Sequence, residues 1–336
     1  MFDFRDLHTR VVAAPMAGGP STPSLVVAAE RAGGIGQLAA GYRTPEQLSA
    51  DIQAVRREAD LFGVNLFVPE ERPIDGAALS DYRRALIPYA EQHGVELPEL
   101  DDIGADDDYY NEKLALVCAH EVPVVSFTFG CPTPRTIDRL HKAGASVGVT
   151  VTTADDALTA ADAGADWICV QGPEAGGHRA TYTRDIAPPI QPLHDLIRDV
   201  RQTVSLPLVA SGGIATAEQA DAARGLGPVA VQVGTVLLRT TEAGTKPAHA
   251  AALADPTRTE TVVTRAFSGR AARGLRNTFI DQFNERAVPE YPAVNTLTTG
   301  FRRTLSGNPD AINLWAGTGY QHAQVESAVD AVKRLG

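Results

Sequence analysis

Short apolar runs recur along this chain, and most of them end at a glycine or proline turn and lead into an alanine-rich stretch. The runs occupy residues 11–14, 34–37, 62–66, 124–127, 147–151, 167–170, 208–210 and 231–233. The clearest helical stretches that follow them span residues 23–31, 45–59, 154–163 and 217–224. Strands that alternate with helices favour a parallel sheet, and eight such units favour closure of that sheet. The sequence therefore predicts an α/β fold, a (β/α)8 TIM barrel. The rival, an open doubly wound sheet, would need a dinucleotide fingerprint after the first strand, and residues 14–19 do not carry one.

A long connection between the third and fourth predicted strands interrupts this rhythm at residues 69–122. It contains an acidic segment at residues 99–108. We interpret that segment as a solvated loop, and not as a metal site. We expect a helix to begin near Asp108 and to run through Leu114 and Val117.

A second interruption covers residues 241–303, which are rich in Arg, Thr and Gly and show weak periodicity. We interpret this stretch as a small, mainly helical inserted domain that caps one side of the barrel mouth. A last helix is expected at residues 321–335, with Val325 on its partly buried stripe. The predicted organisation is a cofactor-binding barrel at 1–240, the inserted cap domain at 241–303 and a returning segment at 304–336.

Charge and cysteine content limit the classes of function. The net charge of −11 disfavours nucleic-acid binding, because an acidic surface repels phosphate backbones. No stretch approaches the roughly 18 apolar residues of a membrane span, so no membrane association is expected. The first residues carry acids and lack the long apolar core of a signal peptide. The three cysteines are too few and too scattered for a disulfide framework or a zinc site, which predicts a cytoplasmic protein without metal.

Two glycine turns close the last two predicted strands. Ser211, Gly212 and Gly213 follow one strand, and Gly234 and Thr235 follow the next. Glycine lets backbone N–H groups approach an anion closely, and a helix N-terminus favours negative charge. Two such turns about twenty residues apart suit the phosphate site after strands seven and eight of a barrel. These five residues are therefore predicted to bind a phosphorylated cofactor.

The loop after the sixth predicted strand carries Gln171, Gly176, Gly177 and His178. Active sites of such barrels lie at the carboxyl ends of the strands, which places these residues on the active rim. The two glycines allow backbone amides to approach a flat ring or a phosphate. His178 could act as a general acid or base, or as a fixed hydrogen-bond donor.

Three other strand ends offer candidate contacts. Asn65 could bridge the heteroatoms of a bound ring, because an amide both donates and accepts, although a turn asparagine is the alternative. Met16 could pack against an aromatic ring or simply fill the core. Thr128 could point at a substrate, whereas Cys131 has no histidine at a telling spacing and is not expected to be a nucleophile. Hydrolase and P-loop signatures are absent, so the sequence favours cofactor chemistry.

Together these segments resemble the nitronate monooxygenase family, also described as 2-nitropropane dioxygenase-like. The resemblance runs nearly end to end, through residues 14–19, 32–36, 63–67, 125–130, 171–178, 210–214, 232–235, 267–274 and 315–317. It implies a TIM barrel that binds FMN and carries a small inserted domain. The FMN contacts implied are Ala14, Met16, Asn65, Gln171, Gly176, Gly177, Ser211, Gly212, Gly213, Gln232, Gly234 and Thr235. His178 is similar to the family's active-site histidine beside the reactive face of the flavin.

The resemblance also implies an activity, the FMN-dependent oxidation of alkyl nitronates with dioxygen to a carbonyl product and nitrite. Propionate 3-nitronate is the typical substrate. This chain departs from the family at Thr128, where members often carry a histidine. Threonine does not titrate near neutral pH, and its shorter side chain leaves more space.

Two other functions stay open on the same barrel. The first is an FMN-dependent NAD(P)H:quinone or enoyl-thioester reductase. The second is a flavin-free isomerase or synthase that acts on a phosphorylated metabolite. Arg265, Arg270 and Arg273 of the insert either supply positive charge to the pocket or pair with acids on the surface.

Overall fold

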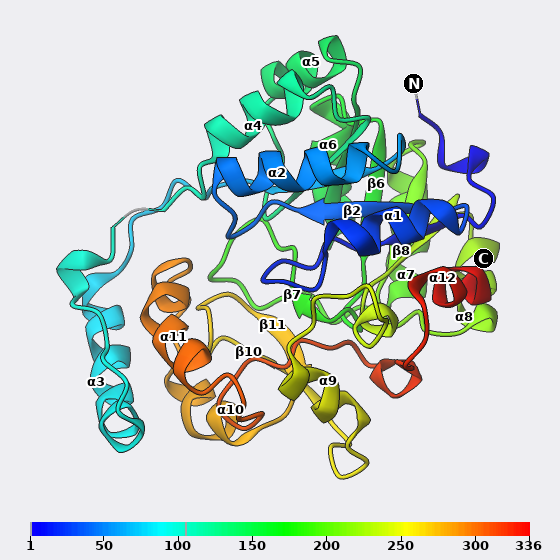
Figure 1. Ribbon diagram of the computed structural model, residues 1–336. Coiled ribbons are helices and arrows are strands. Elements are labelled where there is room, and N and C mark those ends of the chain that lie inside the picture. The colour runs from blue at the N-terminus through cyan, green and yellow to red at the C-terminus, as the bar shows by residue number, and fades with distance from the viewer. Residues whose placement is uncertain (1, 105) are drawn as a thin grey trace.

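The computed structural model describes residues 2–104 and 106–336 and contains a closed barrel of eight parallel strands (Figure 1). Residue 1 of the predicted barrel segment and residue 105 of the acidic segment lie outside the described residues. The barrel strands, in their order around the barrel, are β1 (Val11–Ala13), β2 (Ile35–Ala39), β3 (Gly63–Phe67), β4 (Val124–Thr128), β5 (Ser146–Val151), β6 (Trp167–Gln171), β8 (Leu208–Ser211) and β9 (Ala230–Val233). Strand β9 pairs with β1 and closes the barrel, so the predicted TIM-barrel fold is confirmed.

Helices cover the outside of the barrel. They are α1 (Pro23–Arg31), α2 (Pro45–Arg56), α4 (Tyr110–Ala119), α5 (Pro134–Lys142), α6 (Ala154–Asp162), α7 (Leu193–Thr203), α8 (Ala217–Gly225) and α12 (Ala328–Leu335). Helices α1, α2 and α5 begin alike, with proline in the first turn and a threonine N-cap at Thr22, Thr44 or Thr133. The threonine oxygen accepts an N–H group of the first turn, and proline suits that turn because its missing N–H is not needed there.

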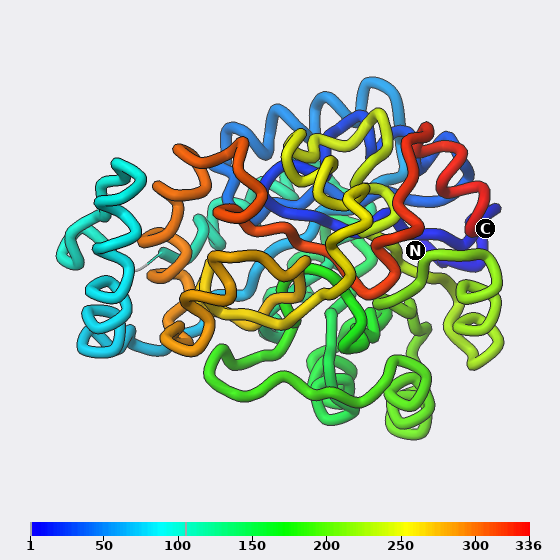
Figure 2. Tube along the Cα trace, turned by 90° about the horizontal axis from the view of Figure 1, so that it is seen from below, coloured from blue at the N-terminus to red at the C-terminus, as the bar shows by residue number. Residues whose placement is uncertain are grey.

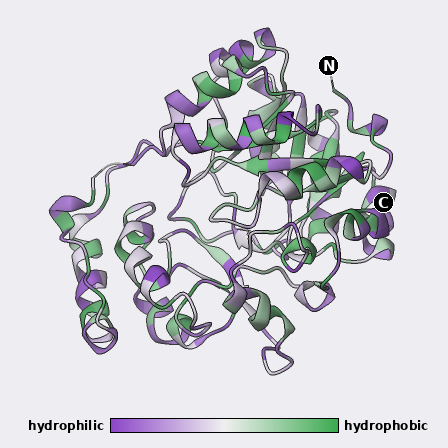
Figure 3. Cartoon of the chain, viewed as in Figure 1, coloured by the Kyte–Doolittle hydropathy of each residue, from purple (hydrophilic) through white to green (hydrophobic). Residues whose placement is uncertain are grey.

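Apolar side chains fill the barrel, whose strands are coloured largely as hydrophobic in Figure 3. At the amino-terminal end of the barrel, the short helix η1 (Phe4–Asp6) places Phe4 edge-on against Trp167, with ring centroids 4.8 Å apart. A Cβ atom at Gly148 would lie only 2.2 Å from the Trp167 ring, so the indole fills the space that this glycine leaves. This end of the barrel is therefore packed, and a binding site has to form at the carboxyl ends of the strands.

A second layer lies over the carboxyl ends of the strands (Figures 1 and 2). It consists of α3 (Gly76–His93), α9 (Pro247–Ala254), α10 (Thr278–Phe283), α11 (Ala293–Thr304) and an antiparallel sheet of β10 (Thr261–Thr264), β11 (Ala272–Leu275) and β7 (Gly177–His178). We call this layer the cap. Its apolar core joins side chains of α3, α10 and α11, and both views show α3 beside α11.

The cap differs from the expected insert in two ways. Helix α3 belongs to the connection between β3 and β4, and the sequence analysis assigned no helix to residues 76–93 of that connection. The segment expected to be mainly helical also contributes the two strands β10 and β11. The helix expected near Asp108 is α4, which begins at Tyr110.

The last helix is shorter than expected. It begins at Ala328 and not at residue 321, because the Ser327 hydroxyl caps it by accepting the N–H of Asp330 at 3.1 Å. Val325, expected on a buried stripe, lies before the helix and is 72% exposed. Across the described ranges, no helix combines the length and apolarity needed to cross a membrane.

Candidate active site

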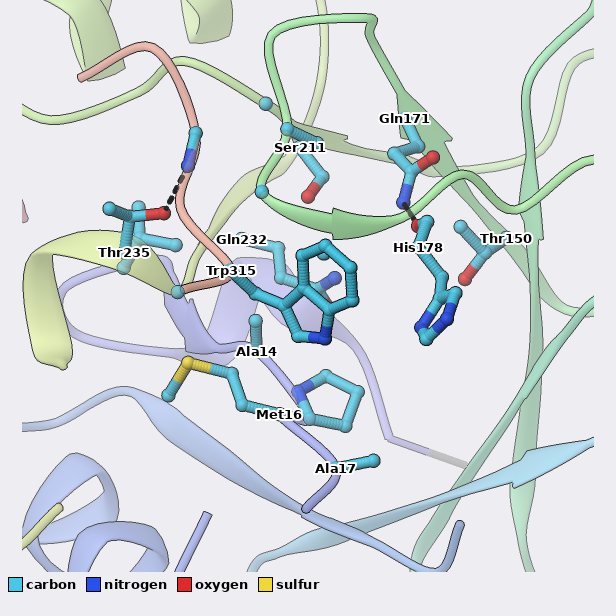
Figure 4. A pocket seen from close by; sticks show the side chains of 18 of the residues that line it. Ala14, Met16, Ala17, Thr150, Gln171, His178, Ser211, Gln232, Thr235 and Trp315 are labelled. Atoms are coloured by element: carbon cyan, nitrogen blue, oxygen red, sulfur yellow. Dashed lines mark hydrogen bonds between the residues drawn. The ribbon is translucent and has the colours of Figure 1, made fainter. Parts of the chain in front are cut away.

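The carboxyl ends of the barrel strands surround one cavity (Figure 4). All fourteen site residues predicted from the sequence line it: Ala14, Met16, Asn65, Thr128, Gln171, Gly176, Gly177, His178, Ser211, Gly212, Gly213, Gln232, Gly234 and Thr235. They come from the ends of six barrel strands and from β7. The fold therefore brings every predicted residue to one place, while their individual roles stay predictions.

Glycine is required where the loops around this cavity meet. Gly213 has a φ of +70°, and a Cβ atom there would lie 2.8 Å from the Cβ of Glu174. A Cβ atom at Gly176 would lie 2.4 Å from the backbone nitrogen of Gly317. The N–H of Gly317 in turn donates to the Thr235 hydroxyl at 2.9 Å (Figure 4). The turns after β6, β8 and β9 thus meet the segment around Gly317, which lies between residue 304 and the last helix.

These turns offer free donors to a ligand. Within the described ranges, the backbone N–H groups of Gly213 and Thr235 donate to no protein acceptor. Both lie at the carboxyl ends of adjacent strands, β8 and β9, and both line the cavity. Two unpaired N–H groups at neighbouring strand ends can bind one anion.

A chain of neutral polar side chains forms the floor of the cavity. The Ser126 hydroxyl donates to Gln37 Oε1 at 2.6 Å, and Asn65 Nδ2 donates to Ser126 Oγ at 2.9 Å and to Thr128 Oγ1 at 3.0 Å. Gln37 Nε2 donates to Gln232 Oε1 at 3.2 Å. Because Gln232 accepts with its oxygen, its Nε2 remains available to a ligand. Gln37 and Ser126, which the sequence analysis missed, therefore orient two predicted contact residues.

Gln171 is engaged by its own loop. Its Oε1 accepts the N–H of Ala180 at 2.9 Å, and its Nε2 donates to the backbone oxygen of His178 at 3.1 Å (Figure 4). The side chain thereby ties the end of β6 to strand β7. In this structure, Gln171 positions the histidine loop through both ends of its amide.

His178 lies on β7, where it pairs with Ala272 of β11. Its Nε2 lies 2.8 Å from the Ser268 hydroxyl. Aromatic rings surround the imidazole, with the centroids of Phe129 and Trp315 at 5.7 Å and 5.5 Å. The imidazole is thus fixed by one hydrogen bond and enclosed by apolar rings.

Burial is the main cause of a large pKa shift at His178. Together with the nearby positive charges of Arg270 and Arg302, burial lowers the pKa of His178 to about 3. A group with such a pKa is neutral at physiological pH. These surroundings therefore favour a neutral imidazole, which can still donate one hydrogen bond.

Comparison with known proteins decides the family. The family model for nitronate monooxygenase matches residues 4–335. The chain belongs to the nitronate monooxygenase family. It is 33% identical over 313 residues to a probable nitronate monooxygenase of Staphylococcus aureus, which covers 91% of this chain and 87% of that protein. The chain is therefore an oxidoreductase.

Solved structures agree with this assignment. A nitroalkane oxidase from Streptomyces ansochromogenes superposes with a TM-score of 0.93 at 39% identity, covering 98% of this chain and 95% of that one. FabK from Thermotoga maritima superposes with a TM-score of 0.76 at 24% identity, covering 99% of this chain and 93% of that one. The second likeness shows the shared fold alone.

The three arginines considered from the sequence do not line the cavity of this nitronate monooxygenase family member. Arg270 is buried, with its guanidinium 4.0 Å from the Phe129 ring centroid and Nη1 3.7 Å from a carboxylate oxygen of Glu70. Arg265 and Arg273 donate mainly to backbone oxygens. Arg270 therefore lies outside the cavity, behind the residues that line it. There it packs against the Phe129 ring and contributes to the lowered pKa of His178.

Nucleophilic and metal chemistry find little support in the site. Burial raises the pKa of Cys131 to about 11, so little thiolate exists near neutral pH. Among the residues that the structure describes, no three His, Cys, Asp or Glu side chains gather as a metal site would require.

Sequence reasoning missed several residues that shape the site, among them Tyr42, Ser268, His249 and Trp315. Ser268 and Trp315 lie in segments that match the family, and Tyr42 follows the second strand, so weak signals existed for these three. His249 lies on α9 with no motif around it. Only the folded chain brings it to the cavity.

Proposed function

We propose that this enzyme uses FMN to oxidise alkyl nitronates, such as propionate 3-nitronate, with dioxygen to a carbonyl product and nitrite. Family membership and the 39% identity to a nitroalkane oxidase support the reaction class. The observation that carries the proposal is a histidine, held by Ser268, that lines a cavity whose rim presents free backbone N–H groups.

The residues present fit FMN. Its monophosphate would accept the unpaired N–H groups of Gly213 and Thr235. A Cβ atom at Gly234 would crowd Met16 Sδ at 3.3 Å, so the glycine keeps this surface flat beside a soft side chain that suits a ring. The free Nε2 of Gln232 can donate to a ring heteroatom. When bound, FMN would supply the redox chemistry, since it can exchange electrons with both substrate and oxygen.

The environment of His178 fits an anionic substrate. The Ser268 hydroxyl lies closer to His178 Nε2, at 2.8 Å, than to the backbone oxygen of Arg270, at 3.2 Å. If the hydroxyl donates to Nε2, the proton of the neutral imidazole resides on Nδ1. That N–H can donate to a nitronate oxygen and orient the reacting carbon.

The low pKa of His178 also bears on the choice of substrate. A base with a pKa near 3 accepts a proton from carbon poorly, so the site is less suited to deprotonating a neutral nitroalkane than to receiving a nitronate. The aromatic rings beside the imidazole lower the local polarity, which strengthens such a hydrogen bond.

The test is a His178→Asn variant, assayed for oxygen consumption and nitrite release with propionate 3-nitronate. We expect FMN content to be retained and most turnover to be lost. His194→Asn, on the exposed face of α7, is the matched control and should behave as wild type. Unchanged kinetics in His178→Asn would refute the assigned role. Anaerobic mixing with NADH or NADPH tests the reductase alternative, which predicts rapid bleaching of the flavin where we expect none.

A further inference from the structure

A second chamber adjoins the first beside His178. It has a volume of about 500 Å³ and lies between the loop after β1, the start of α9 and helix α11. Five residues line both chambers: Ala17, Tyr42, His178, His249 and Trp315. Small-molecule sites typically measure about 300–1,000 Å³, so the second chamber alone has the size of a binding site.

Positive charge in this chamber is not balanced by acids. Lys246, Arg302 and Arg303 line it, and no aspartate or glutamate of the described residues does so. None of these three cations lies within 4.0 Å of a carboxylate oxygen in the part of the chain that the structure describes. The chain as a whole has a net charge of −11, so the chamber is locally more positive than the rest of the protein.

Arg302 is the cation that the fold holds in place. Its Nη2 donates to the backbone oxygen of Asn295 at 2.6 Å and to the Asn295 Oδ1 and Thr299 Oγ1 atoms at 2.9 Å each. All three acceptors are neutral, so the guanidinium charge remains uncompensated. Burial lowers the pKa of Arg302, which means that the surroundings disfavour the charge in the absence of an anion.

His249 provides a second, independent observation. Its side chain is buried, with 8% of the residue exposed, and its Nε2 has no hydrogen-bond partner among residues 2–104 and 106–336. Buried polar atoms are normally hydrogen-bonded, because an unpaired one costs free energy. Since His249 lines both chambers, the missing partner is expected to be a ligand atom that lies between them.

We infer that the second chamber is a subsite for a second oxyanion of the substrate, a carboxylate at the far end of an aliphatic nitronate. Arg302 would bind this carboxylate, with His249 and Lys246 beside it. The inference rests on the proposed function and adds to it a preference for nitronates that carry a carboxylate. The volume of the chamber favours tails longer than that of propionate 3-nitronate.

Charge and geometry give this subsite its selectivity. An Arg–carboxylate pair in a partly buried site is stronger than one in water, and the planar guanidinium can bind both carboxylate oxygens. Burial, and after it the repulsion from Arg302, lowers the pKa of Lys246, and a bound carboxylate would relieve this repulsion. A neutral alkyl tail would not relieve this repulsion. The charge on the substrate tail should therefore control the affinity for the substrate.

The test compares the nitronates of 1-nitropropane, 3-nitropropionate and 5-nitropentanoate as substrates of the FMN-loaded enzyme. In wild type we expect the highest kcat/KM for the longest carboxylated substrate. In Arg302→Gln the ratio of kcat/KM for carboxylated to neutral nitronates should fall about tenfold or more, chiefly through KM, because a charged hydrogen bond is lost. Arg302→Lys should retain part of the preference. Arg198→Gln, an exposed arginine on α7, is the matched control and should leave the ratio unchanged.

Binding of glutarate, an unreactive dicarboxylate, separates this inference from the proposed function. Isothermal titration should detect glutarate binding in wild type, and the affinity should fall about tenfold in Arg302→Gln even if no nitronate is turned over. A ratio that is the same in wild type and Arg302→Gln, with glutarate affinity also unchanged, would overturn the subsite.

Discussion

Removal of the Ser268 hydroxyl tests whether the cap positions His178, the histidine that we propose contacts the substrate. Ser268 is 1% exposed, and its oxygen lies 2.8 Å from His178 Nε2 while accepting the N–H of Arg270 at 3.3 Å. Ser268→Ala leaves the imidazole nitrogen without its partner. One hydrogen bond contributes about 0.5–1.5 kcal/mol net, and 1.4 kcal/mol corresponds to about tenfold. If the bond serves to hold the productive orientation, kcat/KM for a nitronate should fall roughly two- to twelvefold.

The assay combines steady-state oxygen consumption with the pH dependence of kcat/KM. A hydroxyl that donates to Nε2 stabilises the neutral imidazole, so its removal should raise the pKa of His178 and move the acid limb of the profile to higher pH. A purely structural effect would lower activity without this movement. FMN content should stay constant, and Ser205→Ala, at an exposed position before β8, serves as the control. An unchanged kcat/KM and an unchanged acid limb in Ser268→Ala would refute the reasoning.

Three further perturbations follow from the geometry. Gly213→Ala places a Cβ atom 2.8 Å from the Glu174 side chain at a backbone φ of +70°. Flavin fluorescence titration should therefore show an FMN affinity at least about tenfold weaker. Gly76→Ala, where a Cβ atom would meet open space, is the control and should leave the FMN affinity unchanged. Arg184→Met leaves the buried Glu290 unpaired and should cost about 3–5 kcal/mol in urea unfolding; a loss near zero would contradict this. Burial lowers the pKa of His249 from 6.5 to about 4, so the unfolded state binds more protons between these values. Stability should therefore fall as pH drops through that window, by up to roughly 1.4 kcal/mol per pH unit, and urea unfolding of His249→Gln at pH 7 and 5 should show a shallower fall.

Local signals explain why the barrel could be predicted. Each strand is a short apolar run closed by a turn residue, and helix α1 begins where Thr22 and Pro23 mark a helix start. These signals act within a few residues, so they fix the order of strands and helices. Because the carboxyl ends of parallel strands meet at one end of a barrel, the order alone brought Asn65, Gln171 and Gly213 to one cavity.

The parts that were missed depend on contacts between distant segments. Strand β7 has two residues and exists because Gly177 and His178 pair with β11, about a hundred residues later. Helix α3 buries its apolar side chains against α10 and α11, and not against the barrel. Its apolar residues therefore do not follow the pattern of a helix that packs on the barrel. The contact between His178 and Ser268 spans ninety residues. No pattern within a short window carries such information.

The barrel and the cap contribute different kinds of groups to the site, which indicates the layer that determines substrate preference. The barrel contributes neutral polar groups and backbone donors, whereas the cations near His178, Arg270 and Arg302, come from the cap. An anion bound at Arg302 would offset a charge that lowers the pKa of His178, so substrate charge and imidazole basicity are coupled through one side chain. Substitutions in the cap should therefore change which nitronates are accepted and the pH at which they react. The turns after β8 and β9, where we propose that FMN binds, need not change, because they carry none of these charges.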